Sequence, residues 1–214
     1  MIRPMNARPE KASQLIAAAR KVFLQHGFSA ASTDMIQAAA GVSKSTMYAH
    51  FPNKEALFAA VIEEGCATFL SAVRALRLPE STLMESLTAV GRAYLQIVLS
   101  PEALSLFRVI IAEAPRFPEL ARRFYLAGPA AMNDIVASYL DRATARGDVE
   151  LSAIGRDAAA ALFVDLVRSE AQLQCLTHPD SVPSAAQKDQ WVAIAVTTFL
   201  RAYGTKSRSK TRPR

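Results

Sequence analysis

The sequence of 214 residues predicts an all-α protein. Apolar residues recur at the 3.6-residue spacing of amphipathic helices along most of the chain, and no segment shows the alternating β-branched pattern of strands. Prolines, glycines and capping residues break this pattern into about nine helical segments. Hydrophobic residues make up 51% of the chain and charged residues 21%, a balance that allows a globular protein to bury a core. The composition therefore excludes a disordered or collagen-like chain.

Three helices are expected within the first 54 residues. The first covers 9–27, because proline suits the first helical position and glycine suits the residue that ends a helix. The second begins after Thr33 and ends at Gly41. The third begins at Ser43 and ends before Pro52, which has no N–H to donate to a continuing helix. A short helix, a turn and a second short helix, with a stabilising helix before them, have the spacing of a helix-turn-helix unit.

Six longer helical segments follow. Asn53 is a favourable N-cap for a helix that continues towards Pro79. The patterns Thr82–Glu85 and Ser184–Gln187 are capping boxes, and they open the fifth and the ninth helix. Glycine followed by proline at 128–129 should kink or divide the seventh helix. The expected ranges of the six segments are 53–79, 82–97, 100–111, 118–147, 155–176 and 184–199.

Charge is distributed unevenly along the chain, whose formal net charge is +6. Residues 1–54 carry seven basic and two acidic side chains, and residues 206–214 carry five basic side chains and no acidic one. Residues 55–205 carry 13 basic and 17 acidic side chains. A basic head and a basic tail around a mildly acidic body indicate a polyanionic partner that meets one end of the molecule. For the tail, which we expect to be disordered over 204–214, phosphate contact and a merely solubilising role both stay open.

Nothing in the sequence indicates secretion or a membrane span. No unbroken apolar run is longer than 158–164, whereas a spanning helix needs about 20 residues. Near the N-terminus the apolar run 15–19 is halted by two basic residues, so it is not a signal peptide. Cys66 and Cys175 have no motif around them, which fits small core residues in a reducing compartment. We expect a cytoplasmic protein without a membrane partner.

The segment 43–54 has the composition of a surface that contacts DNA. Met47 and Phe51 lie four residues apart and are expected to face inward with Val42. The outer faces of the third helix then carry hydroxyls, an aromatic ring, a methyl group and an imidazole: Ser45, Thr46, Tyr48, Ala49 and His50. This set contains no carboxylate, small hydroxyls donate to phosphate oxygens, and alanine can touch a thymine methyl. A helical hairpin that merely packs is the alternative interpretation.

The metal-ligating and nucleophilic residues argue against an enzyme. Di-iron helical bundles need Glu-x-x-His pairs, and none of the three histidines, at 26, 50 and 178, has a glutamate three residues before it. The sequence also has no glycine-rich phosphate loop. We therefore expect no catalytic residue, metal or cofactor. A helical small-molecule carrier or scaffold without sequence-specific DNA binding stays open as the alternative, and it would show no salt-sensitive shift on duplex DNA.

The run 36–58 resembles the N-terminal domain of the TetR family of bacterial transcriptional regulators. It contains Ala40-Gly41-Val42-Ser43, a tyrosine two residues before His50-Phe51, and then Lys54-Glu55-Ala56-Leu57-Phe58. Three positions depart from the family pattern, in which a small residue, glycine and leucine are common: Gln37, Ser45 and Met47. The stretch 106–120 is similar to the body of the AefR-like subgroup of this family.

The resemblance implies a homodimer that binds a palindromic operator in double-stranded DNA and carries a helical body with a pocket for a small-molecule effector. Repression is the common mode, and an apolar or amphipathic effector would release the operator by changing the separation of the two heads. The last two long helices are expected to form the dimer interface. We expect the helix-turn-helix domain over 9–54, the effector-binding and dimerisation domain over 55–203, and the basic tail over 204–214.

Candidate residues follow for each of these roles. By position in the family pattern and by charge, we expect DNA contacts from Thr33, Ser43, Lys44, Ser45, Thr46, Tyr48, His50 and Lys54. We expect the effector pocket to be lined by Tyr94, Phe107, Ile111, Phe124, Met132 and Phe163. Plain core packing is the alternative for each pocket residue. Apolar faces for dimerisation are expected at Ala161, Leu162, Leu166, Leu173, Trp191 and Ile194.

Overall fold

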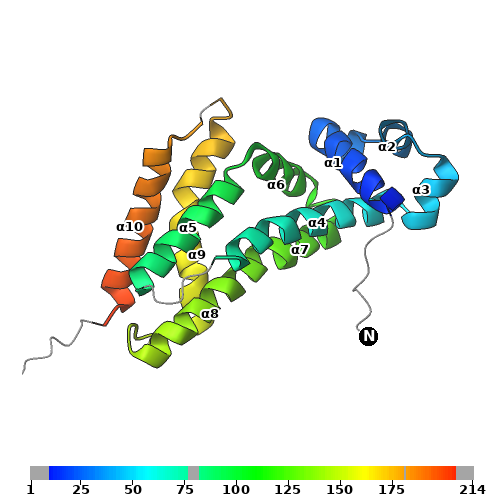
Figure 1. Cartoon of the computed structure of the whole chain (residues 1–214). Coiled ribbons are helices and arrows are strands. Elements are labelled where there is room, and N and C mark those ends of the chain that lie inside the picture. Colours follow the sequence, from blue (N-terminus) through cyan, green and yellow to red (C-terminus); the bar gives the residue numbers. More distant parts are fainter. Residues whose placement is uncertain (1–9, 77–81, 181, 206–214) are drawn as a thin grey trace, which may run out of the picture. The chain divides into compact units, whose positions relative to one another are not determined.

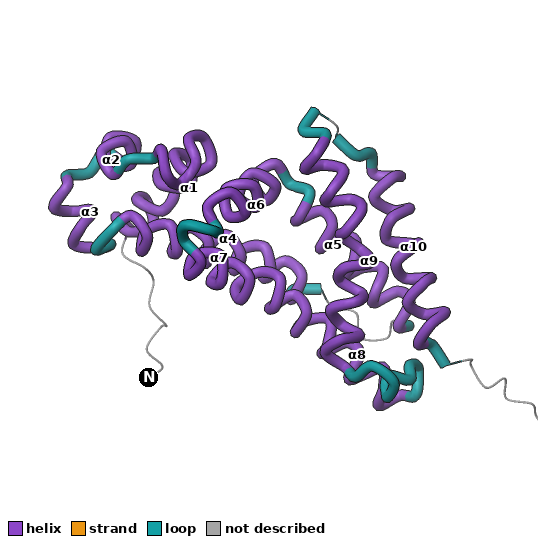
Figure 2. The backbone as a smooth tube through the Cα atoms, turned by 180° about the vertical axis from the view of Figure 1, so that it is seen from behind, coloured by secondary structure: helices purple, strands orange, loops and turns teal. Residues whose placement is uncertain are grey.

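The computed structural model describes residues 10–76, 82–180 and 182–205, and within these ranges the protein is helical (Figures 1 and 2). The α-helices are α1 (Glu10–Ala30), α2 (Thr33–Ala40), α3 (Lys44–His50), α4 (Lys54–Arg74), α5 (Leu83–Val98), α6 (Pro101–Glu113), α7 (Pro118–Tyr125), α8 (Ala131–Arg146), α9 (Arg156–Thr177) and α10 (Ala185–Tyr203). A π-helical turn, η1 (Leu126–Ala130), lies between α7 and α8. The all-α prediction is confirmed. The predicted tail falls almost entirely on residues 206–214, which lie outside the described ranges.

The described residues form two compact units. The first unit contains residues 10–68 and 101–128, and the second contains 69–76, 82–100, 129–180 and 182–205. We call them unit 1 and unit 2. Unit 1 therefore holds the three N-terminal helices and the larger part of α4 together with α6 and α7, and the expected division into domains at 54–55 stays a prediction.

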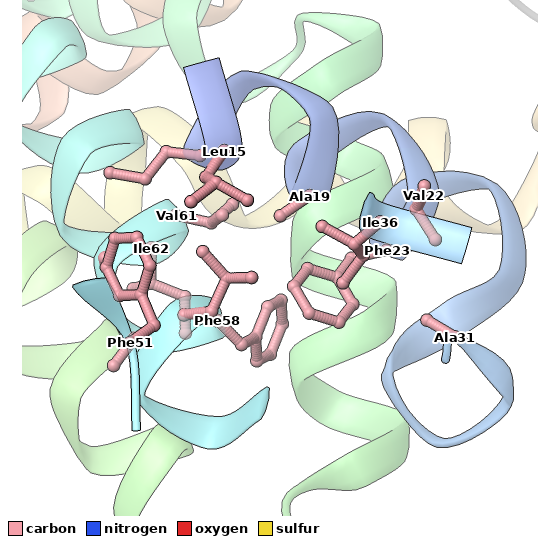
Figure 3. Packing of buried hydrophobic residues seen from close by; sticks show 14 of the residues in the cluster. Leu15, Ala19, Val22, Phe23, Ala31, Ile36, Phe51, Phe58, Val61 and Ile62 are labelled. Atoms are coloured by element: carbon pink, nitrogen blue, oxygen red, sulfur yellow. The ribbon is translucent and has the colours of Figure 1, made fainter. Parts of the chain in front are cut away.

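Aromatic rings form the centre of the core of unit 1 (Figure 3). Phe23, Phe28 and Phe58 are fully buried, and their ring centroids lie 4.8 to 5.6 Å apart. The ring of Phe117, which precedes α7, meets Phe28 edge-on at 4.7 Å. Because these rings come from α1, from α4 and from the residue before α7, the core packs α1 and α4 against a later part of the chain.

The boundaries of the N-terminal helices differ from the expected ones by a few residues. Helical hydrogen bonding resumes after Gly27, whose φ of 77° marks a kink, so α1 continues to Ala30. The N-cap of α2 is Ser32 and not Thr33, because the Ser32 hydroxyl accepts the Met35 N–H at 3.1 Å. Gly41 ends α2 in the left-handed conformation with φ 63°, as its sequence position predicts.

The start of α4 was predicted correctly, and its end was not. The Asn53 carboxamide oxygen caps the helix by accepting the Ala56 N–H at 2.7 Å. The helix ends at Arg74, before the predicted stop at Pro79, and residues 77–81 lie outside the described ranges. By length and composition α4 could cross a membrane, since its apolar window has a mean hydropathy of 1.6. About half of that window (56%) is buried within the protein, as expected of a core helix.

In unit 2, α5, α9 and α10 lie side by side, and α8 packs on α9 (Figures 1 and 2). Valine side chains from α9 and α10 pack against Gly91 of α5, where an added Cβ would lie 3.0 Å from a Val192 methyl and 3.5 Å from a Val167 methyl. The capping box at Thr82 and Glu85 is confirmed in full.

Two further predictions concern the start of α10 and the end of α7, and the first is only partly confirmed. At the start of α10 the predicted capping box is half formed: Ser184 accepts the Gln187 N–H, but the Gln187 carboxamide turns to Gln174 at 3.5 Å. The break at Gly128–Pro129 is confirmed, because η1 separates α7 from α8 there.

Candidate DNA interface

The helix α3 is anchored on one side and exposed on the other. Met47 is 1% exposed and Phe51 is 9% exposed, so both belong to the core of unit 1 as predicted. Figure 3 shows Phe51 in this core. Tyr48, which lies next to Met47 in sequence, is 41% exposed. Lys44 and Ser45 are exposed as well, and Thr46 and His50 are half-buried. The structure therefore presents the predicted polar side chains on the free face of α3.

Three hydroxyls form a cluster at the start of α3. The Ser43 hydroxyl is the N-cap, accepting the Thr46 N–H at 3.2 Å. Its Oγ also lies 2.9 Å from Ser45 Oγ and 2.8 Å from Thr46 Oγ1. Each hydroxyl has one proton, so two hydrogen bonds among three hydroxyls leave one O–H to donate elsewhere. That proton is available to an acceptor such as a phosphate oxygen.

The two lysines that bracket α3 differ in their surroundings. Lys44 is exposed, and no described residue forms a hydrogen bond or an ion pair with its ammonium group. Lys54 is half-buried, and its Nζ donates to the carbonyls of Phe28 at 2.9 Å and Ala31 at 3.0 Å. A longer contact of 3.4 Å reaches the Ser29 carbonyl. The ammonium group also lies 4.6 Å from the centroid of the Phe28 ring. Phosphate contact by Lys54 stays a prediction, and it would compete with these internal contacts.

Two departures from the family pattern are in contact with each other. The carboxamide of Gln37 in α2 lies 3.9 Å from the sulfur of Met47 in α3. A longer side chain at each position thus fills the space between the two helices. At the far end of α2, Gln14 of α1 donates to the Ala40 carbonyl at 2.9 Å. Thr33, the other predicted contact, is the first residue of α2 and is half-buried.

A polar cluster that the sequence did not predict joins the end of α1 to the end of α6. Both oxygens of the Glu113 carboxylate are used: one accepts the Ser29 N–H at 2.8 Å and the other accepts the Ser29 hydroxyl at 2.7 Å. Arg116 also donates to the Ser29 oxygen, at 3.1 Å. The partners are separated by 84 residues, and no local pattern in the sequence links them.

The six predicted pocket residues are divided between the two units. In unit 1, the rings of Phe107 and Phe124 meet edge-on at 6.2 Å, and Ile111 is 57% exposed. In unit 2, Tyr94, Met132 and Phe163 are buried. Phe163 packs edge-on against Phe199 at 5.5 Å, a contact that also fits the core interpretation. Burial raises the pKa of the Tyr94 hydroxyl above its ordinary value, an effect that neighbouring Arg168 opposes. A shared effector pocket stays a prediction.

Unit 2 has an open surface cavity of about 400 Å³ that lies apart from the predicted pocket residues. It is lined by Arg74, Leu76, Asp134, Ile135, Ser138, Tyr139 and Arg142. The Arg142 guanidinium lies 4.5 Å over the Tyr139 ring. Within the described part of the chain, no group of three His, Cys, Asp or Glu residues is placed to hold a metal ion.

The predicted dimer residues lie on outward faces of α9 and α10. Leu162 and Leu166 are partly exposed, and Leu173 and Ile194 are 59% and 57% exposed. Ala161 and Trp191 are half-buried. Exposed leucines spaced four and seven residues apart lie on one side of a helix, so these three leucines share one face of α9.

Two known protein families match this chain, one over the helix-turn-helix region and one over the C-terminal helices. Residues 15–61 match the family described as bacterial regulatory proteins, tetR family. Residues 85–205, more than half of the chain, match the AefR-like transcriptional repressor, C-terminal domain. The protein belongs to the TetR family. It is therefore a helix-turn-helix transcriptional regulator that binds DNA, and both the predicted resemblance and the AefR-like subgroup are confirmed.

Relatives of this TetR-family regulator extend the comparison. The activator FasR of Mycolicibacterium smegmatis is 34% identical over 91 residues, which is 42% of each chain. The regulator UidR of Escherichia coli K12 is 29% identical over 119 residues, covering 54% of this chain and 57% of UidR. The chain thus matches about half the length of these curated relatives. Among solved structures, the flavonoid-responsive regulator FrrA has a TM-score of 0.80 and 35% identity, covering 94% of this chain and all of FrrA. A TetR-family regulator from Mesorhizobium loti also has a TM-score of 0.80, with 25% identity and the same coverage.

Membership in the TetR family resolves two of the alternatives raised by the sequence. TetR regulators are not enzymes, so the prediction of a non-catalytic protein is confirmed. A carrier or scaffold without DNA binding is excluded, because the helix-turn-helix domain of this regulator is the DNA-binding part of the family.

Proposed function

We propose that this TetR-family regulator is a ligand-responsive repressor that binds a palindromic operator as a homodimer and releases it when a small amphipathic effector binds. The observation that carries this proposal is the free face of α3. That face is held outward by buried Met47, and it offers hydroxyl, phenol and ammonium donors without a carboxylate. Such a surface is suited to the phosphates and base edges of a major groove.

The individual contacts can be divided by chemistry. Lys44, Thr33 and the hydroxyl cluster at the start of α3 are proposed to bind phosphates, because ammonium and hydroxyl groups donate to phosphate oxygens. Tyr48, Ala49 and His50 lie further along α3 and are proposed to lie against the bases and sugars. Two copies of α3, one from each subunit, would read half-sites about 34–36 Å apart.

The test is a double substitution, Lys44→Ala with Tyr48→Ala, in the full chain. Its affinity is measured by fluorescence anisotropy on a duplex that the unsubstituted protein selects from a random-sequence library. Loss of one phosphate contact and one groove contact per subunit should weaken binding by at least about 100-fold. Lys188→Ala with Tyr125→Ala removes the same two side-chain types elsewhere and should leave the affinity unchanged. Equal affinity of the first double variant and the unsubstituted protein would contradict the proposed interface.

The homodimer is proposed from the exposed apolar faces of α9 and α10. One α3 helix reads too few base pairs to be selective, so two heads are needed for a specific operator. Leu173 and Ile194 would be buried by a second copy of the same surface, as in an isologous interface.

The effector is proposed to be amphipathic because the predicted pocket residues are mostly aromatic and aliphatic, with the Tyr94 hydroxyl as a polar group. The 35% identical regulator FrrA is flavonoid-responsive, which supports an aromatic ligand of this type. The test adds a panel of flavonoids to the protein on its selected duplex. A fall in operator affinity by a factor of about 5 to 150 is the usual range of such coupling. Unchanged affinity at saturation of a flavonoid that binds the protein would contradict this part of the proposal.

Repression is proposed because the C-terminal match is to a repressor domain. Among the relatives, FasR is an activator and AcnR of Corynebacterium efficiens is a repressor. Removing this regulator from its bacterial host should therefore raise transcription of the gene beside its selected operator, and lowered transcription would contradict repression. A regulator of chromosomal genes would act in the cytoplasm.

A further inference from the structure

The end of α1 and the residue that follows it are held by two opposite charges. We call residues 28–31, which are the part of α1 after its kink at Gly27 together with Ala31, the α1–α2 connection. Its carbonyl groups accept hydrogen bonds from Lys54 of α4, and the N–H and hydroxyl of Ser29 donate to Glu113 of α6. All of these residues lie within unit 1.

Lys54 binds carbonyls at the end of α1 and at the residue that follows it. The last carbonyls of a helix have no N–H within that helix, and a positive charge near them is favourable. Two short hydrogen bonds and one longer contact use the three N–H groups of the ammonium. The ammonium also lies over the ring of Phe28, which is fully buried. The ammonium group of Lys54 therefore points towards the α1–α2 connection of its own chain.

Glu113 binds the same connection through the N–H and hydroxyl groups of Ser29. Its two oxygens accept one N–H and one O–H of Ser29, a paired arrangement that fixes the direction of the peptide as well as its position. Arg116 donates to the same hydroxyl oxygen, and Phe117 packs on the Phe28 ring. The end of α6 thus holds the connection at its backbone and at its aromatic side chain.

Both charged residues occupy the unfavourable end of their own helix. Lys54 is the first residue of α4, where a helix prefers an acidic side chain, and Glu113 is the last residue of α6, where a helix prefers a basic one. Local helix stability therefore explains neither residue. The hydrogen bonds to the α1–α2 connection do explain both.

From this geometry we infer that Lys54 and Glu113 are positioning residues, which fix the α1–α2 connection and thereby the placement of α2 and α3 for operator binding. Ala31, whose carbonyl binds Lys54, directly precedes Ser32, the N-cap of α2. The other end of α2 is fixed by Gln14, and α3 follows through the turn at Gly41. The inference rests on the proposed operator binding, and it replaces phosphate contact as the role of Lys54.

The salt dependence of DNA binding separates positioning from phosphate contact. Each phosphate neutralised by a lysine adds about 0.9 to the slope of log K against log salt, and it strengthens binding to any duplex. A positioning residue leaves the slope unchanged, and its loss lowers the affinity for the selected operator, which depends on the correct placement of α3, far more than the affinity for random duplex.

The experiment compares Lys54→Met with Lys44→Met on the selected operator and on a random duplex, over a range of salt concentrations. Methionine retains an apolar stem over Phe28 and removes the charge. For Lys54→Met we expect the ratio of operator affinity to random-duplex affinity to fall by about 10- to 100-fold, with an unchanged slope. For Lys44→Met we expect a slope reduced by about 0.9 per subunit and weaker binding to both duplexes. A slope reduction by Lys54→Met equal to that of Lys44→Met would overturn the inference.

Glu113→Gln gives a second test that does not depend on the folding of the Lys54 variant. Removing a negative charge from a protein that binds a polyanion should by itself strengthen binding to every duplex. A positioning role predicts the opposite sign on the operator: lower operator affinity with no loss on random duplex. Glu119→Gln, which removes an exposed glutamate that forms an ion pair with Arg122 of the same helix, is the matched control and should not lower operator affinity. Operator affinity of Glu113→Gln equal to or above that of Glu119→Gln would overturn the inference.

The outcomes also separate this inference from the function on which it rests. If the unsubstituted protein selects no duplex, the proposed operator binding fails, and the positioning role fails with it. If the unsubstituted protein and Lys44→Met behave as expected but the Lys54 and Glu113 variants keep full operator affinity, only the positioning role fails.

Discussion

At the scale of single residues, burial determines the chemistry of Cys66. Its thiol lies in the core of unit 1, where a Cβ added to Gly128 would come within 3.3 Å of the sulfur. Desolvation raises the pKa of this thiol from 9.0 to about 11. Only the thiolate reacts with disulfides and alkylating agents, so we expect Cys66 to react slowly at neutral pH.

The prediction concerns a Cys175→Ala variant, in which Cys66 is the only cysteine. The higher pKa lowers the thiolate fraction about 100-fold, and burial restricts access further, so the folded protein should react with Ellman's reagent at least about 100-fold more slowly than a small thiol. Unfolding in denaturant should release one fully reactive thiol. A reaction in the folded protein as fast as that of a small thiol would contradict the burial.

For Lys44 and Lys54, the sequence predicts a positively charged donor but not the group to which it donates. Both are lysines beside the same short helix, and the sequence predicted the same role for both. The structure separates them because the partners of Lys54 are backbone carbonyls 23 to 26 residues earlier in the chain. A side chain indicates its own chemistry, whereas the partner depends on the fold. The cluster of Ser29 and Glu113 was missed for the same reason.

At the scale of helices, signals at the ends were predicted well where their cause is local. The capping box of α5 is complete, because the Glu85 carboxylate accepts the Thr82 N–H at 2.8 Å and the Thr82 hydroxyl accepts the Glu85 N–H at 3.2 Å. At α10 the same pattern is only half formed, because the Gln187 carboxamide has an alternative partner in α9. The end of α1 was missed by a few residues, since helical hydrogen bonding resumes after a kink at Gly27. Local rules therefore fail where a tertiary partner competes.

The capping box predicts a pH dependence of stability. The Thr82 N–H, and then the Thr82 hydroxyl, hold the pKa of Glu85 below its ordinary value of 4.5. A lowered pKa means that the folded state binds this proton less readily than the unfolded state. The contribution is therefore complete above pH 4.5 and is lost as the pH falls through the lowered pKa.

The measurement compares the free energy of unfolding of Glu85→Gln with that of the unsubstituted protein at a series of acidic pH values. The difference between the two should be largest above the ordinary pKa of glutamate and should shrink as the pH falls. Glu170→Gln, at an exposed position in α9, should show no such convergence. A Glu85→Gln difference that is constant across the series would contradict the assigned role of the carboxylate.

At the scale of the whole molecule, helix periodicity predicted the class of fold but not which helices share a core. The end of the helix-turn-helix pattern suggested a division near residue 54. In the structure, Leu106, Ile110 and Leu120 from α6 and α7 belong to the same core as the head helices. The C-terminal match to the AefR-like domain contains these helices, so the regions defined by similarity and the compact units defined by packing overlap. An apolar stripe shows that a helix is buried on one side, and the identity of its neighbour depends on long-range packing.

The last prediction tests the dimer through one exposed residue. Ile194 of α10 is 57% exposed, and burying it against a second copy would remove its side chain from water. Ile194→Lys places a charge in that interface and should shift the protein from dimer to monomer in sedimentation equilibrium at micromolar concentration. The same variant should lose operator affinity, because each half-site would then be bound separately. Met84→Lys at the equally exposed Met84 of α5 is the matched control and should remain dimeric. An unsubstituted protein that is monomeric at this concentration, or an Ile194→Lys variant that sediments as the unsubstituted dimer does, would contradict the proposed interface.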